Sequence, residues 1–141
     1  METVFYKNEE QKYALIQLHG GAYVSGYNDT YRKVAKKYLK SNRNLKVFSL
    51  CYSLAPENPF PKALEESIAL YQYLLLNGYK PENIIVAGDS AGDGLTLALG
   101  LALKDKQIEL PKAMITMSAW TDLADEGISY QKNLYKDPFF W

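Results

Sequence analysis

The amino-acid sequence predicts an α/β fold in which a mostly parallel sheet carries helices on both faces. Three observations support this fold class. Short β-prone runs alternate with stretches of helical length and spacing along the whole chain. The runs expected to be strands are almost continuously apolar, as strands covered on both faces usually are. Each glycine-containing loop of interest follows an expected strand directly, which is where a parallel sheet places its chemistry.

The first half of the chain contributes the expected edge and the first two central strands. A short edge strand is expected at Val4–Tyr6, and the apolar run Tyr13–Leu18 predicts a buried strand. The lysine-rich stretch Tyr31–Ser41 has apolar residues at helical spacing on one side, which predicts a helix with one packed face. Lys46–Tyr52 is again apolar and predicts the next strand.

The second half repeats this alternation. Lys62–Asn77 has apolar residues at helical spacing, and Gly78 is suited to end that helix. Asn83–Ala87 predicts a third buried strand, followed by the strongly apolar helix Ala91–Lys104. Ala113–Met117 predicts a fourth strand, which we expect to present an unpaired edge that promotes association.

Composition limits the possible partners and the possible chemistry. The 141 residues are 48% hydrophobic, which is enough for one domain with a core, and 16 basic residues balance 16 acidic ones. We therefore expect neither nucleic acid nor an anionic membrane as a partner, and no apolar run reaches the roughly 20 residues that span a bilayer. The lone Cys51 lies in an expected strand and is interpreted as a small buried hydrophobe; with no visible secretory signal, a cytoplasmic location is expected. The single histidine, His19, excludes the usual zinc patterns, and no metal is expected.

The segment Gly88-Asp89-Ser90-Ala91-Gly92 matches the G-x-S-x-G nucleophile elbow. It lies between an expected strand and an expected helix, and a tight turn there would raise the Ser90 hydroxyl above the sheet. The neighbours must then be small, and the Ala91 amide at the helix N-terminus could stabilise negative charge on a substrate oxygen. The alternative is a glycine-rich helix cap in which Ser90 is only a capping hydroxyl.

A second glycine motif, His19-Gly20-Gly21-Ala22, follows the strand Tyr13–Leu18. Consecutive glycines let a backbone approach a ligand closely and present amides to it. The amides of Gly20 and Gly21 are therefore candidate donors to the same oxygen, although an ordinary turn would have the same sequence.

Four segments together resemble one family. HGGAYVSG, then YSLAPENPFPKALEE, then GDSAG and finally SAWTDL occur in the order and rough spacing of hormone-sensitive-lipase-like carboxylesterases, which are α/β-hydrolases with an HGGG loop. The resemblance implies that Ser90 is the nucleophile and that Gly20, Gly21 and Ala91 form the oxyanion hole. It further implies that His19 supports that loop, that short or medium acyl esters are the substrates, and that no cofactor is used.

The sequence departs from the family pattern at several places. Ala22 replaces the third HGGG glycine, and Ser53 replaces a common arginine. Asp93 replaces the glycine that follows GDSAG in the family, at a position where the backbone usually packs closely and leaves no room for a side chain. The resemblance also implies a cap segment before the first motif, and an acid and a histidine after further strands. We therefore expect residues 1–141 to be a partial catalytic domain of a truncated α/β-hydrolase fold, without cap, late strands, triad acid or triad histidine.

The expected function is hydrolysis of small carboxylic esters through an acyl-enzyme on Ser90, with the 141 residues alone inactive. His19 is not expected to be the base, because the base follows the serine in this family. Asp122 and Asp125 follow the fourth strand, and Asp122 is expected to stabilise its loop. The alternative from another class is a non-catalytic binding protein or pseudoenzyme on the same scaffold. The oligomeric state was not predictable from the sequence.

Overall fold

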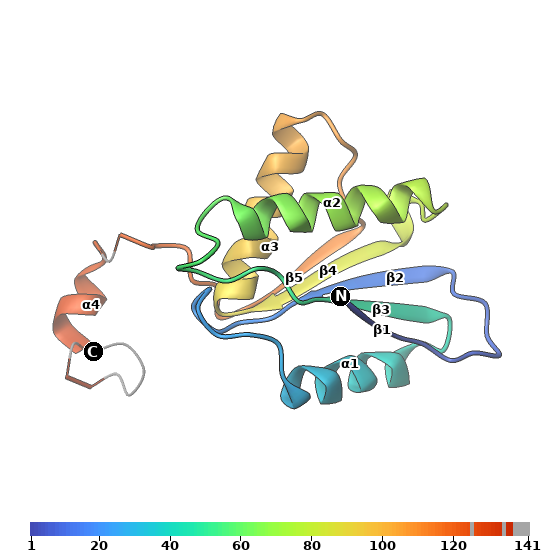
Figure 1. Ribbon diagram of the computed structural model, residues 1–141, viewed down its shortest axis with the longest axis horizontal. Helices are drawn as coiled ribbons and strands as arrows, with labels where there is room; N and C mark the ends of the chain where they lie inside the picture. Colours follow the sequence, from blue (N-terminus) through green and yellow to red (C-terminus); the bar gives the residue numbers. More distant parts are fainter. Residues whose placement is uncertain (125, 134, 137–141) are drawn as a thin grey trace.

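Five strands form one sheet in the computed structural model, which describes residues 1–124, 126–133 and 135–136. In spatial order they are β1 (Glu2–Val4), β3 (Leu45–Leu50), β2 (Tyr13–Leu18), β4 (Ile84–Asp89) and β5 (Ala113–Met117). Only β1 runs antiparallel to its neighbour, and the other pairs are parallel (Figure 1). The predicted mostly parallel sheet is confirmed.

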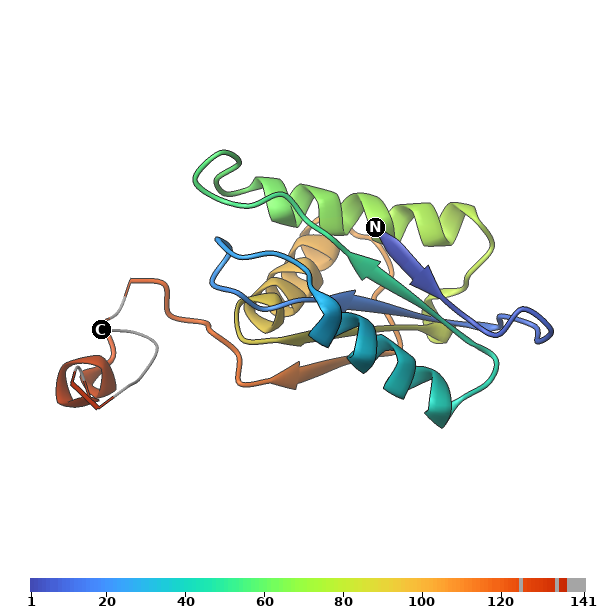
Figure 2. The ribbon, with the colours of Figure 1, turned by 60° about the horizontal axis from the view of Figure 1, so that its bottom comes forward.

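Helices cover both faces of this sheet, as predicted. α1 (Asp29–Ser41) lies on one face, whereas α2 (Lys62–Leu76) and α3 (Ala91–Asp105) lie on the other (Figures 1 and 2). On β2, Leu15 packs in the core on the α1 side and Ile16 in the core on the side of α2 and α3. Successive residues of a strand point to opposite faces, so a continuous apolar run serves both cores.

The start of α1 is set by a side-chain cap. Asn28 has an extended backbone, and its Oδ1 accepts a hydrogen bond from the Thr30 amide at 2.9 Å. Asparagine at this position satisfies one of the free amides of the first turn. The helix therefore begins at Asp29, two residues before the predicted Tyr31.

Gly78 ends α2, as the sequence predicted. It has a φ of +88°, which glycine adopts without the steric cost of a side chain. The amides of Gly78 and Tyr79 donate to the carbonyls of Leu75 and Leu74, each at 3.1 Å. These two bonds form the glycine-terminated helix end known as the Schellman motif.

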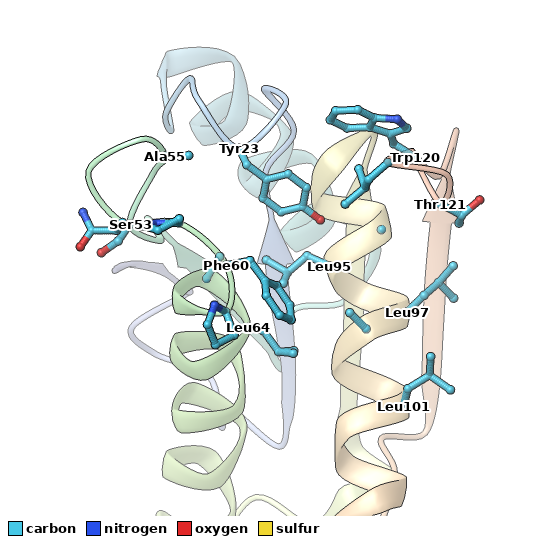
Figure 3. A pocket seen from close by; sticks show the side chains of 17 residues that line it. Tyr23, Ser53, Ala55, Phe60, Leu64, Leu95, Leu97, Leu101, Trp120 and Thr121 are labelled. Atoms are coloured by element: carbon cyan, nitrogen blue, oxygen red, sulfur yellow. The ribbon is translucent and has the colours of Figure 1, made fainter. Parts of the chain in front are cut away.

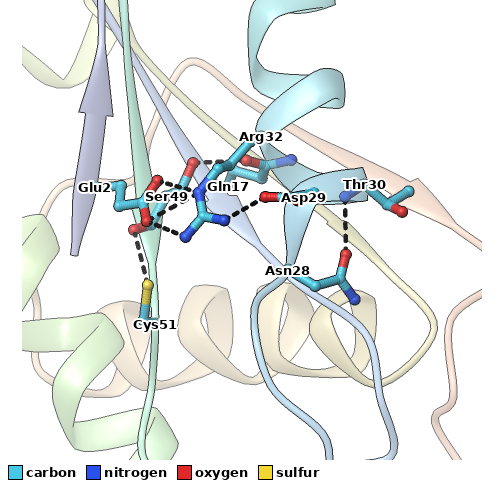
Figure 4. Close-up of polar contacts among 8 residues, drawn as sticks. All are labelled: Glu2, Gln17, Asn28, Asp29, Thr30, Arg32, Ser49 and Cys51. Atoms are coloured by element: carbon cyan, nitrogen blue, oxygen red, sulfur yellow. Dashed lines mark hydrogen bonds and ion pairs between the residues drawn. The ribbon is translucent and has the colours of Figure 1, made fainter.

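The β1 edge of the sheet is short and carries a charge. It lies at Glu2–Val4 and not at the predicted Val4–Tyr6. Arg32 of α1 donates to the Glu2 carboxylate at 2.6 Å, which ties the helix to this strand (Figure 4). A short strand with a paired charge is a poor template for further strands.

The opposite edge, β5, is open. Among the described residues it pairs with β4 alone, and all five of its residues are exposed. After β5 the chain leaves the sheet, and α4 (Ile128–Asn133), which was not predicted, lies apart from the main body (Figures 1 and 2). A 3-10 turn at Pro81–Asn83 was not predicted either. In the part of the chain that the structure describes, no helix is both long enough and apolar enough to cross a membrane.

Candidate active site

Ser90 lies on the sharp turn between β4 and α3. Its backbone has φ 53° and ψ −119°, a region that residues with a side chain rarely adopt. The Ser90 amide donates to the Met117 carbonyl at 3.1 Å, and its carbonyl accepts from the amides of Asp93 and Trp120 at 3.1 and 3.2 Å. These bonds, from β5, the loop after it and α3, hold Ser90 in the strained conformation predicted for it.

The glycines around Ser90 are required by close backbone contacts. A Cβ atom on Gly92 would collide with the carbonyl oxygens of Leu18 and His19, at the end of β2. A Cβ atom on Gly88 would collide with the Gly92 carbonyl. The turn therefore closes only because both positions lack a side chain. This explains why the G-x-S-x-G motif has glycine two residues before and two residues after the serine.

The glycine loop after β2 reaches the Ser90 turn through Asp89 and Tyr31. A Cβ atom on Gly20 would lie 2.8 Å from the Asp89 carboxylate, so the two loops are in contact. The Gly20 amide donates to the Tyr31 hydroxyl at 2.9 Å, and that hydroxyl donates to Asp89 Oδ2 at 3.1 Å. The amide of Gly20 is thus already engaged, whereas Gly21 adopts a φ of +115°, a conformation that favours glycine.

Ala91 is the first residue of α3 and is fully buried beside Ser90. The first amides of a helix have no carbonyl partner within the helix, and the helix dipole makes this end attractive to negative charge. The Ala91 amide is therefore available to a group near Ser90.

His19 is buried beneath the glycine loop. Its ring stacks on Tyr52 with centroids 4.0 Å apart, its Nδ1 lies 2.7 Å from the Gly20 carbonyl, and the Tyr52 hydroxyl donates to the His19 carbonyl at 2.6 Å. Burial lowers the pKa of His19, and the Gly20 carbonyl opposes this only in part. A neutral ring that donates from Nδ1 holds the loop backbone in place. Its Nε2 is buried and has no hydrogen-bond partner among the described residues.

An apolar cavity of about 520 Å³ lies beside α3 (Figure 3). Its wall includes Tyr23 from the glycine loop, Leu64 from α2, Leu101 from α3, and Trp120 from the loop after β5. The rings of Tyr23 and Trp120 lie 6.3 Å apart. Ser90 does not line the cavity, although Trp120 contacts the Ser90 carbonyl through its amide.

Comparison with known proteins identifies this arrangement. A family model described as the alpha/beta hydrolase fold matches residues 15–141. The chain belongs to this family. The protein EstE5, in a crystal soaked with p-nitrophenyl butyrate, superposes with a TM-score of 0.87 at 34% identity, covering 98% of this chain and 47% of that one. An esterase from the bacterial hormone-sensitive lipase family superposes with a TM-score of 0.82 at 36% identity, covering 96% and 46%.

Relatives of this chain include an acetyl-hydrolase and an esterase. The chain is 41% identical over 116 residues to an acetyl-hydrolase of Streptomyces hygroscopicus, covering 82% of this chain and 38% of the relative. It is 40% identical over 123 residues to an esterase of Acinetobacter venetianus, covering 87% and 40%. The resemblance to hormone-sensitive-lipase-like hydrolases is confirmed, and the chain spans about two-fifths of the length of these relatives.

Two further interpretations of the sequence, for Cys51 and Asp122, have different outcomes in the structure. Cys51 is exposed and lies just beyond β3, so its interpretation as a buried strand residue was wrong. Asp122 holds its own loop as expected, because its carboxylate accepts from the amides of Ala124 and Gly127, each at 3.1 Å. Asp125 lies outside the described residues.

Two features of the site were not predicted from the sequence. Tyr31 connects the two loops, but the sequence marked it only as the first residue of a predicted helix. Asp93 is fully buried in the first turn of α3, and neither of its carboxylate oxygens has a hydrogen-bond partner among the described residues. The sequence had marked Asp93 only as a departure from the family pattern.

Proposed function

We propose that this chain supplies the nucleophile half of a serine carboxylesterase that acts on small carboxylic esters. The observation that carries the proposal is the strained backbone of Ser90 on a turn that only glycine neighbours permit. Strain of this kind costs on the order of 1–3 kcal/mol and is found mainly at functional sites. The names of the relatives, acetyl-hydrolase and esterase, support the same substrate class.

In the proposed mechanism, Ser90 Oγ bonds to the ester carbonyl carbon while a base removes its proton. The carbonyl π electrons move to the oxygen, which becomes an oxyanion. When the tetrahedral intermediate collapses, the bond to the alcohol oxygen breaks, the alcohol takes up the proton, and the acyl group stays on Ser90. Water then attacks the acyl-enzyme by the same route and releases the carboxylic acid and free Ser90.

The oxyanion would be bound by backbone amides from two loops. Ala91 contributes the amide at the N-terminus of α3, and Gly21 contributes one from the loop after β2. The sequence also suggested Gly20, but its amide donates to Tyr31, so we assign the second donor to Gly21. Each such donor is worth about 3 kcal/mol in the transition state.

The general base has to come from outside these 141 residues. His19 is the only histidine of the chain, and it is buried and committed to the Gly20 carbonyl through Nδ1. A serine without a histidine base retains only a small part of its reactivity. We therefore propose that the 141-residue polypeptide alone does not hydrolyse esters and that a histidine and an acid supplied by the remainder of a hydrolase complete the site.

A covalent chimera tests this function. The 141 residues replace the matched segment of the S. hygroscopicus acetyl-hydrolase, and hydrolysis of p-nitrophenyl acetate is measured. We expect a turnover that falls by about 10³-fold or more in the Ser90→Ala chimera, whereas a Ser41→Ala chimera, changed at an exposed serine at the end of α1, keeps its rate.

The alternative is a non-catalytic binding protein on the hydrolase scaffold. Binding alone gains nothing from a strained Ser90, so this alternative leaves the elbow geometry unexplained. A folded chimera whose residual hydrolysis is unchanged by the Ser90→Ala substitution would overturn the proposed esterase function and favour the binding protein.

A further inference from the structure

The charges of this chain are distributed unevenly along the sequence. Residues 30–56 contain seven basic residues and no acidic one, whereas the rest of the chain contains nine basic residues and sixteen acidic ones. The formal net charge of zero, which by itself predicts no anionic partner, is therefore the average of a basic region and an acidic remainder. Such a distribution gives the two regions surface potentials of opposite sign, so one side of the molecule can attract an anionic surface.

The basic region places four lysines on the outer side of α1. They recur at the spacing i, i+3, i+4 and i+7, which puts side chains on one side of a helix. All four are exposed, whereas Ala35 and Leu39 of the same helix are buried against the sheet. Within the described residues no other helix or strand lies over α1 (Figures 1 and 2). We call this surface the α1 basic face; its members are Lys33, Lys36, Lys37 and Lys40.

The protein does not compensate the charge of the α1 basic face. None of its four lysines has an ion-pair partner among the described residues, whereas Arg32 of the same helix is paired with two carboxylates. Lys33 and Lys37 lie four residues apart, as do Lys36 and Lys40, and like charges at this spacing destabilise a helix. The helix dipole favours a cation only in the last turn, so it accounts for Lys40 alone. An anionic partner would relieve this repulsion.

We propose that the α1 basic face binds the surface of an anionic phospholipid membrane. The apolar side of α1 is packed against the sheet, so the helix would lie on the lipid headgroups without inserting between the acyl chains. A cluster of at least about four lysines is typical of proteins that bind anionic headgroups, and each lysine strengthens such binding about fivefold.

The composition of the face favours lipid over nucleic acid as the anion. It contains no arginine and no aromatic ring, the groups that most often contact bases or stack on them, whereas headgroups require only positive charge. The first turn of α1 also adjoins the candidate active site, because the Tyr31 hydroxyl bonds to the Gly20 amide and to Asp89. A bound α1 would hold this site beside the lipid, where esters with apolar acyl groups collect. This choice of partner rests on the proposed function; the basic face itself does not.

Vesicle flotation tests the proposal without measuring hydrolysis. The 141-residue chain is mixed with vesicles of phosphatidylglycerol and phosphatidylcholine in equal parts, at about 0.1 M salt, and the vesicles are floated through a sucrose gradient. Bound protein rises with the vesicles, whereas aggregated protein sinks. We expect the chain to float with these vesicles and not with vesicles of phosphatidylcholine alone. Binding should weaken about tenfold or more at about 0.5 M salt, because salt screens exposed charges.

A matched pair of variants locates the contact. The double variant Lys36→Gln/Lys37→Gln should bind about tenfold more weakly or worse, since it removes two lysines from the face. The control Lys104→Gln/Lys106→Gln removes the same charge from exposed positions at the end of α3, on the other side of the sheet, and should change binding less than about twofold. Circular dichroism confirms that each variant is folded. Ser90→Ala should bind as the wild type does.

Three results would overturn the membrane proposal. They are no flotation with the phosphatidylglycerol vesicles, flotation that neutral vesicles match or that both double variants weaken alike, and tighter binding to a DNA duplex of about 20 base pairs at the same phosphate concentration, which would make nucleic acid the partner. Membrane binding together with a chimera that lacks Ser90-dependent hydrolysis contradicts the esterase function and leaves the membrane proposal in place. An active chimera without membrane binding contradicts only the membrane proposal.

Discussion

Replacing Asp93 should stabilise this protein, although most substitutions of buried residues destabilise. The Asp93 side chain is fully buried in the first turn of α3, and neither carboxylate oxygen has a partner among the described residues. Removing a buried polar group that makes no hydrogen bond recovers about 1–3 kcal/mol. Loss of a negative charge near a helix N-terminus costs about 0.3–1 kcal/mol. We therefore expect Asp93→Ala to raise the free energy of unfolding by about 1–2 kcal/mol.

The gain should depend on pH. Burial raises the pKa of Asp93, and the charge of Asp89 raises it further. The backbone of Met117 lies near enough to lower this pKa in part, although its geometry does not make a hydrogen bond to either carboxylate oxygen. The folded state then holds its proton to higher pH than the unfolded state, whose Asp has a pKa of about 3.9. The stability of the wild type therefore falls as pH rises from about 4 through the raised pKa, and the penalty is complete above it.

Thermal unfolding at several pH values checks this reasoning. At pH 8, Asp93→Ala should melt roughly 3–8 °C above the wild type, and the difference should shrink toward pH 4. Asp93→Asn is the matched control, because it keeps the shape and the unpartnered polar group but cannot ionise. It should lose the pH dependence while gaining less stability than Asp93→Ala. A lower melting temperature for Asp93→Ala at pH 8, or a difference that does not change with pH, would refute the argument.

Three further predictions follow from the loops and the helix end. Gly92→Ala places a Cβ atom against the Leu18 carbonyl, so the backbone must move, and the free energy of unfolding measured in urea should fall by about 3 kcal/mol or more. A fall of less than about 1 kcal/mol would contradict this contact. Gly78→Ala has open space around it but a φ of +88°, so it should cost only about 1–2 kcal/mol in the same assay; a loss equal to that of Gly92→Ala would show that collision is not the deciding effect. Tyr31→Phe removes the hydroxyl that accepts from Gly20, and hydrogen exchange of the Gly20 amide should accelerate about 2- to 10-fold; an unchanged rate would show that the bond contributes nothing.

The sequence predicted the central fold well because each central strand is an apolar run of its own. β2 and β5 begin and end where the pattern placed them, and Gly78 stops α2 as expected. The start of α1 was missed by two residues because it depends on a side-chain cap from Asn28. The position of β1 was predicted wrongly because a strand of three residues is too short to show a periodic pattern. Its position is set by pairing with β3, which lies far along the chain.

The sequence predicted only those parts of the candidate site that depend on residues close together in the chain. Ser90 and its glycines are constrained by one tight turn, so the motif indicates them directly. The bond between Tyr31 and Asp89 joins residues 58 positions apart, and nothing local to either marks it. The burial of Asp93 and the exposure of Cys51 likewise depend on how β5, α3 and the loop after β3 pack, which single-sequence patterns do not contain.

The hydroxyl of Tyr31 joins the two sides of the sheet mechanically. It belongs to α1, on the face opposite α3, yet it holds the glycine loop after β2 and the residue before Ser90 at once. A tilt of α1 would therefore move the glycine loop and the residue before Ser90 together, and the distance between them would be preserved. Loss of the Tyr31 hydroxyl would let each of these two segments move independently. The relative position of the glycine loop and the Ser90 turn thus depends on a hydroxyl that comes from the α1 side of the sheet, and substitutions on the outer surface of α1 can change that position from a distance.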